Sequence, residues 1–205
     1  MKALRSCPLF AGMSEIEIDL TLGNISYQLV SLPSHEVYAL AGMPCKYVDI
    51  VVSGKLICRM AALSGKQVEV SRLHSGNMVA PAFIFSKDKS LPVSVETDGK
   101  VQLFRMRPEE LKRLIDLDEA IRMNYIRILS NIDVFLTQKM KVLSLFTVRE
   151  KVAYLLMERA GEQGSNEVHL ERSRREIADS FGIQKFSVLR VLSDFEKEGA
   201  IEIHG

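Results

Sequence analysis

Residues 173–192 read SRREIADSFGIQKFSVLRVL, and this stretch predicts two short helices joined by a glycine turn. Ser173 followed by Glu176 is the pattern of a capping box, in which each side chain accepts a hydrogen bond from a backbone amide of the other residue. Ala178 is small where the second helix must come close, and Gly182 supplies the turn. Cap, spacing and turn together predict a helix-turn-helix, the motif that places its second helix in the major groove of DNA.

The outward face of the second helix carries the side chains that we expect to contact base edges: Gln184, Lys185, Phe186, Ser187 and Arg190. Lysine and arginine donate to guanine, glutamine pairs with adenine, and phenylalanine packs on the methyl group of thymine. At the start of the first helix, Ser173, Arg174 and Arg175 suit phosphate contacts, which position a protein without specifying a sequence. The alternative is that these basic residues form only a solvated face.

The charge of the whole chain is nearly zero, at a formal +1. Residues 172–190, however, hold five basic residues against two acidic ones, a local net charge of +3. Affinity for DNA depends on how many phosphates are neutralised at the contact, so near-neutrality does not exclude DNA binding. It does predict weak binding to DNA of unrelated sequence.

The composition is that of an ordinary globular protein, with 205 residues, 47% of them hydrophobic and 26% charged. This length suffices for two modest domains. No apolar run approaches the roughly 20 residues that span a membrane. The first 20 residues, MKALRSCPLFAGMSEIEIDL, show no signal peptide, so we expect a cytoplasmic protein without a membrane partner.

The residues that carry chemistry in other proteins show no useful spacing here. The three cysteines include no CxxC pair, and the four histidines are scattered, so we expect no metal site and no iron–sulfur cluster. No nucleophile–base pair or carboxylate pair stands out. We therefore expect a protein that is not an enzyme.

Residues 25–106 alternate between polar and apolar residues, as β-strands do. In VDIVVSGKLICRM, residues 48–60, two alternating runs flank Ser53-Gly54, which predicts a turn. A second hairpin turn is expected at Leu63-Ser64-Gly65-Lys66. Further strands are expected at Val93–Glu96 and Val101–Met106. Many short strands between frequent turn signals predict a barrel or jelly roll.

Residues 108–143 change to a helical pattern, with Pro108 opening a short helix and a long helix expected from Asp118 to about Leu143. One apolar row along the long helix has the 4-3 spacing of a coiled-coil seam: Ile121, Tyr125, Ile128, Ile132, Phe135 and Val142. A second apolar row lies beside it: Ile126, Leu129, Leu136, Met140 and Leu143. Two apolar rows need two partners. We assign the first row to a second copy of the chain, and the alternative is a helix buried within one monomer.

The residues from 147 onward are mostly helical. A helix in TVREKVAYLLMERA is expected to end near Gly161, and Val168-His169-Leu170 is compatible with a short strand before the opening motif.

A β-roll, a long dimer helix and a helix-turn-helix, in this order, resemble the Crp/Fnr family of bacterial transcription regulators over nearly the whole chain. VDIVVSGKLICRM is similar to the family's strand, glycine turn and strand, and Gly76-Asn77-Met78 resembles the Gly-Asp-Phe before its ligand cassette. SRREIADSFGIQKFSVLRVLSDFEKEGAI is similar to the family motif throughout. The resemblance implies an α+β fold with a jelly-roll sensor domain and a winged helix-turn-helix.

The resemblance also implies three functional segments along the chain. Residues 1–116 would form a cyclic-nucleotide-binding-like effector domain, residues 117–143 a dimerisation helix, and residues 144–205 the winged DNA-binding domain. The implied partners are double-stranded DNA with a palindromic operator, a second copy of the chain, a small-molecule effector and RNA polymerase. The chain ends at residues 201–205, where a second wing strand would follow, so a truncated or minimal wing is expected.

The ligand cassette departs from the family's cyclic AMP-binding branch. That branch carries Gly-Glu and then Arg-Ser or Arg-Thr, where this chain has Ala80-Pro81 and Leu91-Pro92. A cyclic phosphate would be buried there without a charged partner, which is very costly, so cyclic AMP is disfavoured as the effector. The candidate effector-pocket residues are Met78, Val79, Ala80, Pro81, Leu91 and Pro92. They either line a pocket for an apolar or planar ligand or form core; haem stays open, but no ligand spacing supports it.

The recognition helix departs from the family as well. The family often reads Arg-Glu-Thr-Val-x-Arg, whereas Lys185–Arg190 keeps the two basic ends and replaces the base-reading glutamate by Phe186. This predicts an operator different from that of the relatives. The leading hypothesis is a homodimeric, effector-switched, sequence-specific transcription regulator. The alternative is a sensing or protein-interaction module whose helix-turn-helix no longer binds DNA.

Overall fold

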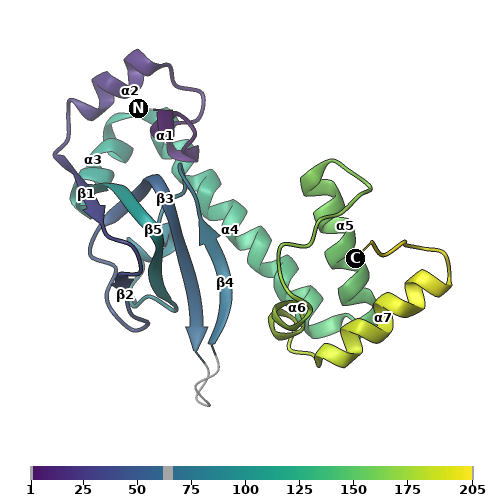
Figure 1. Ribbon diagram of the computed structural model, residues 1–205. Coiled ribbons are helices and arrows are strands. Elements are labelled where there is room, and N and C mark those ends of the chain that lie inside the picture. The colour runs from purple at the N-terminus through teal and green to yellow at the C-terminus, as the bar shows by residue number, and fades with distance from the viewer. Residues whose placement is uncertain (1, 62–66, 205) are drawn as a thin grey trace. The chain divides into compact units, whose positions relative to one another are not determined.

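The structure is a computed structural model that describes residues 2–61 and 67–204 (Figure 1). Its elements in chain order are α1 (Lys2–Arg5), η1 (Pro8–Phe10), α2 (Glu15–Leu22), β1 (Tyr27–Leu32), β2 (Val37–Ala39), β3 (Val48–Ala61), β4 (Gln67–Leu73), η2 (Pro81–Phe83), β5 (Ser94–Met106), α3 (Pro108–Leu117), α4 (Glu119–Leu145), α5 (Val148–Gln163), α6 (Arg174–Ser180) and α7 (Lys185–Lys197). The chain divides into two compact units, Met1–Val134 and Phe135–Gly205. No helix among the described residues is both long and apolar enough to cross a membrane.

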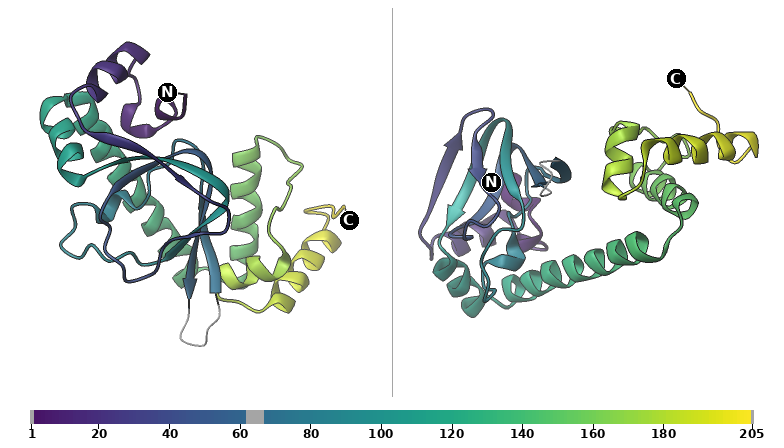
Figure 2. Two further views of the ribbon diagram at one scale, coloured as in Figure 1. Left: turned by 60° about the vertical axis from the view of Figure 1, so that its left-hand side comes forward. Right: turned by 90° about the horizontal axis from the view of Figure 1, so that it is seen from below.

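The first unit is built on one antiparallel sheet of five strands, in which β1, β5, β3 and β4 are neighbours in that order and β2 also pairs with β5. The strands curl into a roll, as Figure 2 shows, and helices α1, α2 and α3 gather at one end of it. The predicted β-roll is therefore confirmed. The hairpin turn predicted at Leu63–Lys66 lies outside the described residues.

The strands are fewer and longer than the sequence pattern predicts. Ser53-Gly54 is not a turn, because β3 runs straight through it and only its register against β5 shifts on both sides of Ser53. Gly54 has a φ of +82°, and a Cβ there would lie 2.3 Å from the carbonyl oxygen of Lys100 on β5. The glycine therefore permits a bulge and a close backbone approach. In the same way the two strands predicted within residues 93–106 form the single strand β5.

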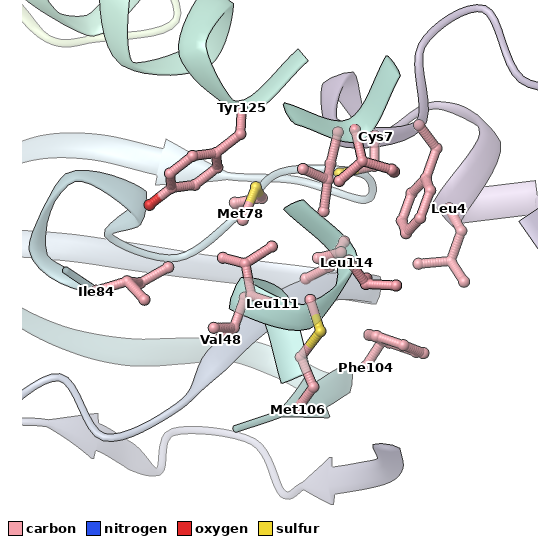
Figure 3. Close-up of a cluster of buried hydrophobic side chains, with 14 of the residues drawn as sticks. Leu4, Cys7, Val48, Met78, Ile84, Phe104, Met106, Leu111, Leu114 and Tyr125 are labelled. Atoms are coloured by element: carbon pink, nitrogen blue, oxygen red, sulfur yellow. The ribbon is translucent and has the colours of Figure 1, made fainter. Parts of the chain in front are cut away.

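The core of the first unit lies between the roll and the helices at its end (Figure 3). Leu111 and Leu114 of α3 are fully buried against Phe104 of the sheet. Tyr125 of α4 also enters this core, and its hydroxyl donates a hydrogen bond of 2.8 Å to the carbonyl oxygen of Pro81. The start of α4 is thus part of the core of the first unit.

A buried polar cluster joins β3 to β5. The Asp49 side chain is fully buried and accepts hydrogen bonds from Nε and Nη2 of Arg105, at 2.8 and 2.7 Å, and from the Tyr38 hydroxyl at 2.7 Å. The Arg105 guanidinium also lies over the Tyr47 ring, 4.5 Å from its centre. Burial and the neighbouring Asp49 carboxylate raise the pKa of Tyr38. Buried charges need such partners, and here the carboxylate has three.

The apolar rows of α4 are covered differently from the prediction. Ile121, Tyr125 and Val142 are buried within their own chain, with exposed fractions of 0%, 6% and 1%. A side chain that packs in its own core cannot also face a second copy, so the assignment of these residues to a dimer seam is corrected. Of the other predicted seam residues, Ile128 and Ile132 are half-buried and Phe135 is exposed. The neighbouring row is the exposed one, and its exposed members are Ile126, Leu136, Met140 and Leu143.

The second unit packs α5, α6 and α7 around the end of α4. Lys139, which interrupts the predicted seam, places its ammonium group 5.8 Å from the centre of the Phe181 ring, and partial burial lowers the pKa of Lys139. The strand considered at residues 168–170 does not form. Instead the Gln163 side chain accepts a hydrogen bond from the backbone N–H of His169 and donates one to its carbonyl oxygen.

Candidate nucleic-acid interface

The helix-turn-helix forms as the sequence predicts. The Ser173 backbone N–H donates to the Glu176 carboxylate at 2.8 Å, and the Glu176 N–H donates to the Ser173 hydroxyl at 3.2 Å, which completes the capping box at the start of α6. Gly182 has a φ of +65° in the turn, a conformation that glycine adopts without strain. Helix α7 then begins at Lys185.

The two helices are held together by buried apolar side chains. Ile177 and Ala178 of α6 and Val188 of α7 are each exposed by 2% or less. The N–H of Ile183 donates to the carbonyl oxygen of Ala178 at 3.0 Å and so fixes the corner between the helices. Because one face of α7 is buried in this way, its opposite face must point outward.

The predicted base-contacting residues lie on that outward face. Gln184, Lys185, Phe186 and Arg190 are exposed, and Ser187 is half-buried. Gln184 occupies the N-cap position of α7, and its side chain makes no capping hydrogen bond, so its amide group is available to a ligand. Within the described parts of the chain, the structure pairs neither Lys185 nor Arg190 with an acidic side chain. The face thus combines available donors with one exposed aromatic ring.

The residues predicted to contact phosphate lie at the start of α6. Ser173 and Arg175 are exposed, and Arg174 is half-buried. The Ser173 oxygen accepts the capping hydrogen bond, so its O–H group can still donate to a phosphate oxygen. The structure thereby places both predicted groups of DNA-contacting residues on one motif.

The end of α7 is braced against α5. The Arg149 guanidinium pairs with Glu198 and lies 4.4 Å from the centre of the Phe195 ring. The hydrogen bond from Arg149 to the Glu198 carboxylate raises the pKa of Arg149. These contacts connect the start of α5 with the end of α7, and the apolar cluster that contains Val188, Val191 and Leu192 packs α7 within its unit.

The candidate effector-pocket residues are mostly packed against other apolar side chains. Met78, Val79 and Leu91 are buried among the apolar side chains of two core clusters, whereas Ala80 and Pro81 are half-buried and Pro92 is exposed. Two hollows in the first unit have other linings, Lys100 and Gln102 in one and Tyr47 and Arg107 in the other. The burial of Met78, Val79 and Leu91 favours the second of the two alternatives given above, in which the apolar run is mainly core.

The packing of Leu91 determines what the cassette can offer to an anionic ligand. Leu91 is only 4% exposed within an apolar cluster, so the position offers no cation for a cyclic phosphate. A cyclic phosphate bound at this position would therefore have no charged partner from Leu91. In the described ranges, 2–61 and 67–204, no group of three or more metal-ligating side chains occurs.

Comparison with known families agrees with this architecture. Residues 29–118 match the family model described as "Cyclic nucleotide-binding domain", and residues 150–205 match the "Crp-like helix-turn-helix domain". A comparison with the sequences of curated proteins gives no match.

Several solved structures share the fold. FixK2 from Bradyrhizobium japonicum is 19% identical with a TM-score of 0.65, and the alignment covers 88% of this chain and 90% of that one. The catabolite activator protein of Thermus thermophilus is 22% identical with a TM-score of 0.60, covering 97% and 91%. The CLP regulator of Xanthomonas campestris, which responds to c-di-GMP, is 21% identical with a TM-score of 0.62, covering 92% and 94%. At these identities the likeness shows the fold alone.

A curled sheet with a long helix and a C-terminal helix-turn-helix defines a class of DNA-binding regulators with an N-terminal β-roll domain. With both family models matched in the expected order, this chain belongs to the Crp/Fnr family of transcription regulators.

Proposed function

We propose that the protein is a homodimeric, sequence-specific DNA-binding transcription regulator that acts in the cytoplasm. The observation that carries the proposal is the outward face of α7, where Gln184, Lys185 and Arg190 are exposed on a rigidly packed helix. In a helix-turn-helix, this is the part that enters the major groove. The proposed role is thus DNA binding and not catalysis.

The two groups of DNA-contacting residues have different proposed roles. Lys185, Ser187 and Arg190 form hydrogen bonds with base edges, and Gln184 pairs with adenine. Arg174 and Arg175, with the Ser173 hydroxyl, bind phosphates and set the position of the motif on the duplex. Two copies in a dimer double the local positive charge at the DNA, which compensates for the near-neutral chain.

The proposed dimer contact is the exposed row of α4, which consists of Ile126, Leu136, Met140 and Leu143. These residues follow a heptad spacing and are 39–63% exposed in the single chain. Asp133 falls in the same row, at a position where a polar residue can set the register of two paired helices. A contact along this row would bring two recognition helices onto one palindromic operator.

The proposed effector acts beside Tyr125, where the cassette meets α4. Phe85 is 47% exposed and contacts the edge of the Tyr125 ring, with ring centres 5.8 Å apart. Tyr125 also holds the carbonyl of Pro81. An apolar or planar ligand that engages Phe85 would therefore move the start of the dimerisation helix. The absorbance spectrum and mass of whatever co-purifies with the protein would test this part; a protein that binds its operator fully without any ligand would contradict it.

A second candidate function rests on Phe186. This side chain is 79% exposed, and exposed aromatic residues are common in protein–protein contacts. In that case the motif would bind a protein and not DNA.

Under the first proposal, in which the chain is a DNA-bound regulator, it would also contact RNA polymerase at its promoters.

Two arginine substitutions separate these functions. On a duplex selected by the protein, Arg190→Ala should weaken binding by about 1–3 kcal/mol and relax the preference at one base pair of each half-site. Arg174→Ala should weaken binding to all sequences alike and reduce the salt dependence. Fluorescence anisotropy against several duplexes measures both. If neither substitution changes DNA affinity, DNA binding through this face is refuted.

A further inference from the structure

Phe186 is an unusual feature of the α7 face. Its side chain is 79% exposed, whereas the apolar residues on the other side of the helix, such as Val188, are buried. It lies in the first turn of α7, between Lys185, which is exposed, and Ser187, which is half-buried. Leu189, three residues further on, is 38% exposed and extends the apolar surface on this side. The recognition face therefore carries a small apolar patch among its polar groups.

A phenylalanine ring in the major groove restricts what can lie opposite it. Guanine, adenine and the amino group of cytosine present hydrogen-bonding atoms, and covering these with an aromatic ring would remove water without replacing the hydrogen bond. The C5 edge of a pyrimidine is the apolar exception. Thymine carries a methyl group at this position, cytosine a hydrogen, and 5-methylcytosine the same methyl as thymine.

We infer that Phe186 recognises pyrimidine C5-methyl groups, so that the protein binds DNA with 5-methylcytosine or thymine at one position of each half-site and discriminates against unmethylated cytosine there. This inference rests on the proposed DNA-binding function. The hydrogen-bond donors Lys185 and Arg190 would align the helix, and Phe186 would contribute a contact that depends on the methyl group alone. Methylation of a cytosine would then raise the affinity of an operator.

The test removes or adds a single methyl group. In the selected duplex each thymine is replaced in turn by uracil, which lacks only the C5-methyl, and the dissociation constant is measured by fluorescence anisotropy. At one of these positions, replacement of thymine by uracil in a single half-site should weaken binding about fourfold, and replacement in both half-sites about fifteenfold. This is the effect expected for burial of one methyl-sized group per half-site. At the same position, 5-methylcytosine should bind about fourfold more tightly than cytosine.

Two variants assign the effect to the ring. Phe186→Ala should bind the thymine and uracil duplexes equally, and because Phe186 is mostly exposed this variant should fold normally. Leu189→Ala, a matched change on the same side of α7, should keep the discrimination. If the unchanged protein binds both duplexes equally at every position, or if Phe186→Ala still discriminates, the inference is overturned while DNA binding stands. If no duplex of any sequence is bound, the proposed function falls as well.

Discussion

Replacement of Leu136 by aspartate tests the exposed row of α4 as the dimer contact. Leu136 is 56% exposed in the single chain, so about half of its surface is left for a partner to cover. Full burial of a leucine side chain is worth about 1.5–3 kcal/mol, which gives about 1 kcal/mol for this half and about 2 kcal/mol for the two copies in a dimer. The carboxylate adds the cost of its own desolvation. The dimer should therefore weaken at least about 30-fold.

Sedimentation equilibrium over a range of protein concentrations measures this change. Leu145→Asp is the matched control, because Leu145 is 74% exposed on the same helix. Nine residues separate the two leucines, about two and a half helical turns, so they point in opposite directions. The control should remain dimeric, and circular dichroism should show the same helix content in both variants.

Two results would refute the reasoning. Leu136→Asp would sediment as the unchanged dimer if the row is merely exposed to solvent. Equal dissociation of the Leu145→Asp control would show that the acidic charge, and not the row, is responsible.

Three further substitutions test what stabilises each of the two units. Asp49→Ala should lower the free energy of unfolding of the first unit by about 3–5 kcal/mol in urea titrations, because it leaves the Arg105 guanidinium without its partner; a change below about 1 kcal/mol would contradict this. Gly182→Ala should cost about 1–2 kcal/mol in the second unit, since φ is +65° while the space around the new Cβ is open; unaltered stability would show that the turn is not left-handed. Glu150→Gln should make the stability of the second unit less sensitive to acid. The Thr147 amide and hydroxyl lower the pKa of Glu150 in the folded state. The ionised Glu150 therefore stabilises the fold above its unfolded-state pKa, and this stabilisation is lost as the pH falls through its folded-state pKa. The Tm of the variant should accordingly fall less than that of the unchanged protein between about pH 5 and pH 3, and parallel curves would argue against the cap.

The helix-turn-helix could be predicted because its signals are local. The capping pair Ser173 and Glu176, the small Ala178 and the turn glycine Gly182 each act within a few residues of the chain, and the structure confirms each role. Pro108 is a similar case, since it opens α3 at the first helical position where proline is tolerated.

Which apolar row of α4 is buried in its own chain could not be predicted, because the spacing of apolar residues is the same for both rows. That choice depends on distant contacts. Asn124 is buried, and its side chain donates to the carbonyl oxygens of Leu9 and Ala11, which turns one side of the helix toward the N-terminal segment. The neighbouring row is left exposed for this reason.

The strand pattern failed for a related reason. A Ser53-Gly54 pair fits a hairpin turn and a strand bulge equally well, and only the approach of β5 to Gly54 decides between them. The pairing of Asp49 with Arg105 was also missed, since 56 residues separate the two. An aspartate within an otherwise apolar strand was the signal that could have indicated a buried ion pair.

Selection of genomic DNA fragments with the purified protein, at a stated salt concentration, is the most direct test of the proposed regulator. We expect enrichment of a palindrome whose half-site centres lie about 34 Å apart, one turn of DNA, so that two recognition helices enter successive major grooves. Binding to the enriched site should weaken steeply as salt is raised. A library with no enriched sequence, even with a cell extract added as a source of effector, would contradict the proposal.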